Sequence, residues 1–115
     1  MTIELTDPED AKLLTLARAS RARTRAAEGA AVRDTDGRTY AATSVDLPSL
    51  RLSALQVATA MAVSSGVRGL EAGLAIGDQP TPAAADIAAV REVAGSGVVV
   101  YQASADGDVV ASVTT

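Results

Sequence analysis

The chain contains neither histidine nor cysteine, so no imidazole or thiolate exists anywhere in its 115 residues. These side chains are the usual ligands of catalytic zinc, histidine is the base of most catalytic triads, and cysteine is required for disulfides. We therefore expect no cofactor, no bound metal, no histidine-based triad and no disulfide. No glycine-rich phosphate loop and no dense acidic cluster is present in their place.

Large aromatic side chains are also missing, since phenylalanine and tryptophan are absent and only Tyr40 and Tyr101 are aromatic. With 48% hydrophobic residues, the core must be built from alanine, valine, leucine and isoleucine. No apolar run is long enough to span a bilayer, and the acidic N-terminus lacks the apolar stretch of a signal peptide. We expect one domain over residues 1–115, cytoplasmic and without a membrane partner.

The net charge of −4 argues against general nucleic-acid binding. Lys12 is the only lysine among the 10 basic residues, a bias that suggests a high-GC bacterial genome. Half of the basic residues fall on the first predicted helix: Lys12, Arg18, Arg21, Arg23 and Arg25. They favour either a solvated helix or, as an alternative, an RNA- or ribosome-associated factor.

Periodicity and turn residues predict eight elements in the order αββαβαββ. They are a helix from Asp7-Pro8 to about Glu28, strands 30–34 and 39–45, a helix 50–65, a strand 69–77, a helix 82–94, and strands 98–101 and 108–113. Gly29 is expected to end the first helix, and Pro48-Ser49 to open the second. The pattern is that of an α/β protein.

The segment Leu52–Val67 carries no charge, although it is predicted to be mostly helical. A helix that is apolar on nearly every side is buried on nearly every side. In a small domain the sheet covers only one face, so the other face contacts either a neighbouring helix or a second subunit. We expect a homo-oligomer, either a dimer or a tetramer.

Several short motifs occur in an order that is typical of one family. Gly29-Ala30-Ala31-Val32 precedes the hairpin Asp36-Gly37-Arg38-Thr39-Tyr40, and Ser44-Val45-Asp46 follows it. Pro82-Ala83-Ala84-Ala85-Asp86 begins the third predicted helix. The chain thus resembles the cytidine deaminase family, in its small homotetrameric branch that acts on free nucleosides. The resemblance implies a three-layer α/β/α sandwich with a mixed five-stranded sheet.

The resemblance also implies where zinc would bind. Family members carry three cysteine or histidine ligands and a glutamate that moves protons. The matching ligand positions here are Ser53, Ala83 and Asp86, and the glutamate position is Leu55. This set cannot build the zinc site, so the sequence predicts a protein that is not an enzyme, in that zinc-dependent deaminase activity is not expected, while another activity stays open. The resulting hypothesis is a pseudoenzyme that acts as a self-associating interaction module.

An alternative hypothesis is a protein that binds a pyrimidine nucleoside or nucleotide. The resemblance places Ser44 and Asp46 where the family holds the ribose, and Ser53 and Asp86 in the remnant of the same pocket. Each residue also has an ordinary explanation. Serine and aspartate are common where a strand enters a loop, and an aspartate early in a helix complements the helix dipole.

Overall fold

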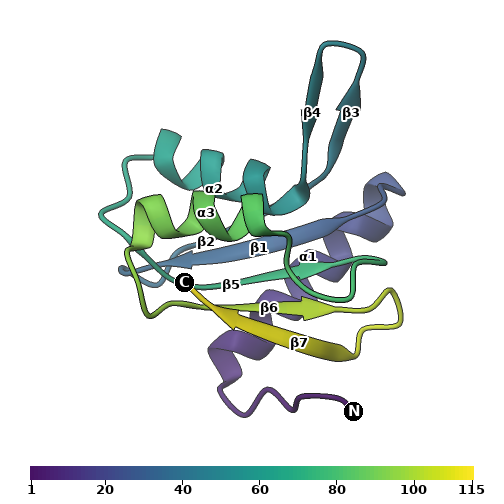
Figure 1. Ribbon diagram of the computed structural model, residues 1–115, viewed down its shortest axis with the longest axis horizontal. Helices are drawn as coiled ribbons and strands as arrows, with labels where there is room; N and C mark the ends of the chain where they lie inside the picture. The colour runs from purple at the N-terminus through teal and green to yellow at the C-terminus, as the bar shows by residue number, and fades with distance from the viewer.

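The computed structural model describes all residues 1–115 and shows a five-stranded sheet between helices, with a separate two-stranded hairpin projecting from it (Figure 1). The helices are α1 (Pro8–Thr24), α2 (Ala54–Ser64) and α3 (Ala84–Ala94). The main strands are β1 (Gly29–Asp34), β2 (Thr39–Thr43), β5 (Leu70–Ile76), β6 (Val99–Ala103) and β7 (Val109–Thr114). The projecting hairpin, called the arm below, consists of β3 (Val45–Leu47) and β4 (Leu50–Leu52).

The strands of the sheet lie in the order β2-β1-β5-β6-β7. Only β5 and β6 are parallel, and α3 makes the crossover connection that a parallel pair requires. The other neighbours are antiparallel, with β2 and β7 at the edges. The predicted α/β class and mixed five-stranded sheet are therefore confirmed.

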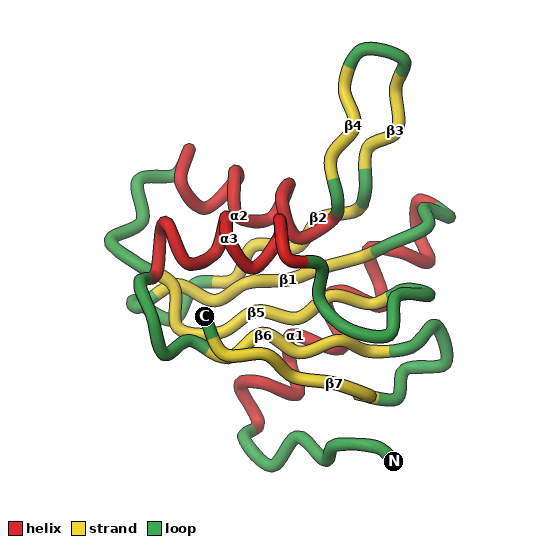
Figure 2. Tube along the Cα trace, in the orientation of Figure 1, coloured by secondary structure: helices red, strands yellow, loops and turns green.

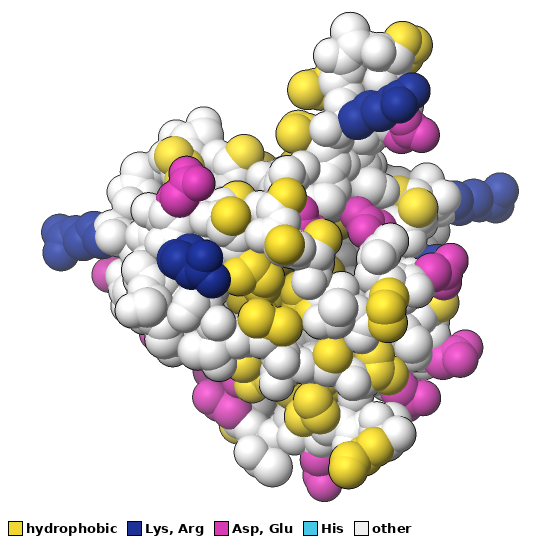
Figure 3. Space-filling view, in the orientation of Figure 1, with side chains coloured by type: hydrophobic (Ala, Val, Ile, Leu, Met, Phe, Trp, Pro, Cys, Tyr) yellow, Lys and Arg dark blue, Asp and Glu magenta, His cyan; other side chains and the backbone are white.

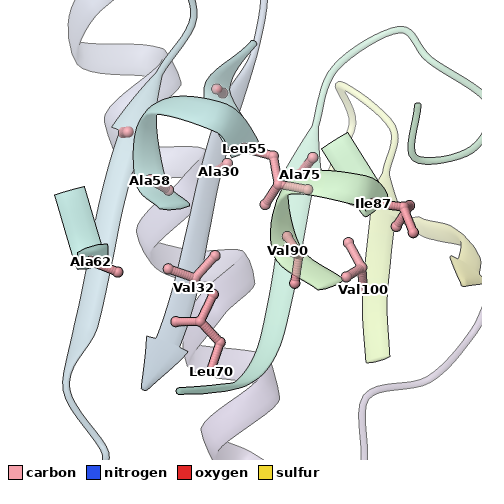
Figure 4. Close-up of a cluster of buried hydrophobic side chains, with 12 residues drawn as sticks. Ala30, Val32, Leu55, Ala58, Ala62, Leu70, Ala75, Ile87, Val90 and Val100 are labelled. Atoms are coloured by element: carbon pink, nitrogen blue, oxygen red, sulfur yellow. The ribbon is translucent and has the colours of Figure 1, made fainter. Parts of the chain in front are cut away.

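The helices cover both faces of the sheet, α1 on one and α2 with α3 on the other (Figure 2). Successive side chains of a strand point to opposite faces, so β1 contributes to two cores. Ala30 and Val32 pack under α2 and α3, among the side chains drawn in Figure 4, whereas Ala31 packs under α1 with Leu13. None of the three helices combines the length and apolarity needed to cross a bilayer.

The first helix ends earlier than predicted, at Thr24 instead of about Glu28. Arg25 adopts a left-handed conformation with φ of 54° and ends the helix. Gly29 is instead the first residue of β1. A side chain there would collide with the carbonyl oxygen of Ala17, so this glycine permits close contact between helix and strand rather than a helix end.

The second helix also begins later than predicted, at Ala54 instead of residue 50. Pro48-Ser49 form the turn of the arm and do not open a helix. The register pairs Val45 with Leu52 and Leu47 with Leu50, so each strand of the arm has only three residues. Strands this short show too few alternations for periodicity to distinguish them from a loop or a helix start.

A buried polar network fastens α1 to the sheet. Arg33 on β1 donates from Nη2 to Asp10 Oδ1 at 2.9 Å, and Tyr101 on β6 donates to Asp10 Oδ2 at 2.7 Å. Arg33 also pairs with Glu71 on β5. Burial, and then the hydrogen bond to Asp10, raises the pKa of Tyr101 to about 12. The neutral phenol therefore stabilises the fold below pH 10, and this contribution disappears as the pH rises toward 12.

Replacing Asp10 with alanine should lower the free energy of unfolding by about 3 kcal/mol, because it leaves the buried Arg33 guanidinium with one partner fewer. Urea denaturation followed by circular dichroism measures this loss. Glu9→Ala is the matched control, since Glu9 is the exposed neighbour in the same helical turn. Equal losses in the two variants would contradict a special role for the network.

Candidate functional site

A polar cavity of about 440 Å³ opens beside the base of the arm. Its lining comes from four segments: residues 27–28 before β1, 44–46 after β2, 51–53 before α2 and 78–79 after β5. The cavity therefore lies at the carboxyl end of β5, where ligands bind in open α/β sheets. The amino end of α2 also points toward it.

Ser44 is fixed to the neighbouring strand by two hydrogen bonds. Its backbone N–H donates to the Glu28 carbonyl at 3.1 Å, and its Oγ accepts from the Glu28 N–H at 3.2 Å. Asp46 lies further out on the arm, where its carboxylate is 3.3 Å from Arg51 Nε and both side chains are exposed. The two residues thus offer one partly buried and one exposed polar group to the cavity.

Ser53 caps α2 and contacts α3 at the same time. Its Oγ accepts from the Gln56 N–H at 3.1 Å, and the Gln56 side chain accepts from the Ser53 N–H at 3.0 Å, which forms a capping box. The Ser53 hydroxyl also donates to Asp86 Oδ1 at 2.8 Å. Asp86 is buried in the first turn of α3, so this bond joins the first turns of both helices.

The structure brings the four predicted site residues to one place. Ser44, Asp46 and Ser53 line the cavity, and Asp86 is bonded to Ser53 behind it. Their roles in binding remain predictions. The helix α1, which carries Arg18, Arg21 and Arg23, lies on the face of the sheet opposite α2 and α3 (Figure 1), and none of its residues lines the cavity.

Glu28 is a cavity residue that the sequence analysis missed. Its carboxylate Oε1 accepts from the backbone N–H of Ala54, the first residue of α2, at 3.2 Å. Asp78 and Gln79, in the loop after β5, were missed as well. For Glu28 a signal was available, because it directly precedes the Gly29-Ala30-Ala31 motif, but it was assigned to the end of the first helix.

The donor atoms here do not fit a catalytic zinc ion. Of the three positions matched to family ligands, Ser53 and Asp86 supply a hydroxyl and one carboxylate that are bonded to each other, and Ala83 has no donor. Leu55, at the glutamate position, is buried in the core. No group of three or more carboxylates is arranged to hold a metal ion. Zinc prefers three nitrogen or sulfur ligands with one open position, which these residues cannot provide.

Fold and site together define an α/β/α sandwich with a polar cavity where two helices begin. A family model described as cytidine deaminase-like matches residues 6–107. The chain therefore belongs to the cytidine deaminase-like family, as the sequence motifs predicted. A search of curated protein sequences gives no match.

Solved structures of cytidine deaminases share the fold. The enzyme from Burkholderia pseudomallei has a TM-score of 0.77 at 23% identity, with 90% of each chain covered. The enzyme from Mycobacterium leprae has a TM-score of 0.71 at 22% identity, with 94% of each chain covered. The enzyme from Mycobacterium tuberculosis has a TM-score of 0.71 at 25% identity, covering 82% of this chain and 85% of its own.

These comparisons contradict the prediction that the chain is not an enzyme. The similar structures named above are all of cytidine deaminases, which are enzymes, and they point to a deaminase rather than a non-enzyme. The prediction was based on the zinc ligands alone. It did not take into account that the cytidine deaminase-like model matches residues 6–107, nearly the whole chain.

The bond between Ser53 and Asp86 should contribute measurably to stability. In a double-mutant cycle of Ser53→Ala and Asp86→Ala, we expect an interaction free energy of about 1.5 kcal/mol, because one partner is charged and the pair is partly buried. Urea denaturation of the four proteins measures it. Ser65→Ala is the control, since its hydroxyl bonds only to Met61 at the exposed end of α2. Additive losses would show that the two side chains are not coupled.

Proposed function

We propose that this member of the cytidine deaminase-like family binds a pyrimidine nucleoside in the cavity at the base of the arm. The observation that supports this most directly is that Ser44 and Asp46, from the segment after β2, line the same polar cavity as Ser53, from the segment before α2. The cavity volume of about 440 Å³ lies in the range of small-molecule sites.

The orientation of the ligand follows from the same residues. Ser44 and Asp46 are the positions at which the family resemblance implies ribose binding, and hydroxyl and carboxylate groups suit the sugar hydroxyls. The base then points toward Ser53 and Glu28 at the amino end of α2. The similar structures, all of cytidine deaminases, support a nucleoside as the ligand class.

Nucleoside binding is tested by isothermal calorimetry and thermal shift with cytidine, uridine and their ribose alone. A ligand at one hundred times its Kd should stabilise the fold by roughly 2.7 kcal/mol. Asp46→Ala should weaken binding roughly tenfold through the lost contact to the sugar, whereas Asp108→Ala, which removes an exposed carboxylate outside the cavity, should not. No binding by any nucleoside would refute the proposal. Formation of uridine from cytidine in the same samples would add turnover to binding.

A second proposal is self-association through the arm and α2. The arm packs mainly on itself, and Leu47 and Leu50 near its tip are 52% and 48% exposed. An isolated two-stranded hairpin is marginally stable in water, so a partner would stabilise it. Figure 3 shows hydrophobic side chains on this projection and on the helical layer beside it.

The chain also carries an apolar groove that could receive the exposed leucines of the arm. An apolar groove of about 420 Å³ runs along α2, lined mainly by Tyr40, Leu52, Val57, Ala60 and Met61, without a charged residue. The groove lies at the foot of the arm, since Leu52 belongs to both. In a two-fold dimer the arm of each subunit could therefore occupy the groove of the other.

Light scattering and sedimentation at micromolar concentration should give a mass of two or four chains, the range expected for this family resemblance. Met61→Asp should reduce the mass to that of one chain, because it places a charge in the groove. Val110→Asp is the control, since Val110 has similar exposure but lies on β7. A wild-type protein that is strictly monomeric would refute this second proposal.

A further inference from the structure

Glu28, the residue directly before β1, is held in the cavity by hydrogen bonds from both its backbone and its carboxylate. Its backbone exchanges two hydrogen bonds with Ser44, and its carboxylate accepts from the first N–H of α2. That N–H belongs to Ala54, 26 residues further along the chain. The positive end of the helix dipole also favours a carboxylate at this position.

The polar side chains beside α2 present lone pairs to the cavity. A carboxylate can accept about four hydrogen bonds, and Ala54 supplies one to Glu28. Ser53 has only one hydroxyl proton, and it is donated to Asp86. Ser53 therefore faces the cavity as an acceptor, like Glu28. Leu55, in the same helical turn, has no polar group to offer.

We propose that Glu28 determines which base the cavity selects, by accepting a hydrogen bond from an amino group on the ring. This inference rests on the proposed nucleoside function. The Glu28 carboxylate bonds to the N–H of Ala54, the residue after Ser53, so with the sugar at Ser44 and Asp46 we place the ring substituent farthest from the sugar against Glu28 and Ser53. A 4-amino group offers two N–H donors to these two acceptors. A 4-oxo group would bring a third acceptor against them, and neither side would have a proton to share.

Calorimetry with cytidine and uridine on the full chain tests the proposal. The wild-type protein should bind cytidine at least roughly tenfold more tightly than uridine, because uridine sets its 4-oxo group against two partly buried acceptors. Glu28→Gln keeps an oxygen for the Ala54 N–H but places an amide N–H₂ toward the cavity, so the ratio should fall to about threefold or less. Glu92→Gln, the same change on the exposed face of α3, should keep the wild-type ratio.

The outcomes separate this inference from the function on which it rests. If the wild-type protein binds both nucleosides without preference, Glu28 does not select the base, although the nucleoside site stands. If the preference exists and survives in Glu28→Gln, another residue is responsible and the inference is overturned. If neither nucleoside binds the wild-type protein, the proposed function fails and this inference with it. If Glu28→Gln does not fold, Glu28→Ala is the second variant, and it should also lower the ratio to about threefold or less because it removes the acceptor.

Discussion

The cavity depends on one contact, the hydrogen bond from the Ser53 hydroxyl to the Asp86 carboxylate. The two residues are 33 positions apart in sequence, and they begin different helices. The parallel pairing of β5 and β6 requires the chain to cross over through α3, which brings the start of α3 to the carboxyl end of β5. There the bond joins the two helix starts. The same serine caps α2, so one side chain both caps this helix and links its first turn to α3.

Much of the fold could be predicted from the sequence because its signals are local. Asp36-Gly37 lies in the turn between β1 and β2, with φ of 85° at Gly37, which glycine adopts without strain. The apolar run 98–101 predicted a strand, and the uncharged stretch Leu52–Val67 predicted a helix, and the structure has β6 and α2 there. Each of these patterns depends only on residues that are close together in the sequence. Local patterns of this kind are sufficient for the order of the elements.

The arm and Glu28 could not be predicted in the same way. Pro48-Ser49 have the chemistry of both a helix start and a tight turn, and only the pairing of Leu47 with Leu50 decides between them. Glu28 directly precedes the Gly29-Ala30-Ala31 motif, but its place at the cavity depends on the contact with Ala54, which the fold supplies. This contact joins two residues that are 26 positions apart in sequence, and the periodicity of either segment contains no sign of it. Of the four residues predicted from the family resemblance, Ser44, Asp46 and Ser53 line the cavity and Asp86 is bonded to Ser53, because a family pattern reflects tertiary contacts that periodicity does not.

The family of this protein indicates a deaminase, whereas its side chains lack the usual ligands of a catalytic zinc ion. The fold is that of the cytidine deaminase-like family over residues 6–107, and the similar structures are of enzymes. The chain nevertheless contains no histidine or cysteine, and the polar side chains that line the cavity carry hydroxyl, carboxylate, amide and guanidinium groups. These groups recognise ligands by hydrogen bonds, whose strength depends on excluding water. The arm matters here, because Val45, Asp46 and Leu52 form one wall of the cavity while Leu47 and Leu50 face solvent. A partner that covered the exposed leucines would fix that wall in place, and binding at the cavity would then be coupled to assembly.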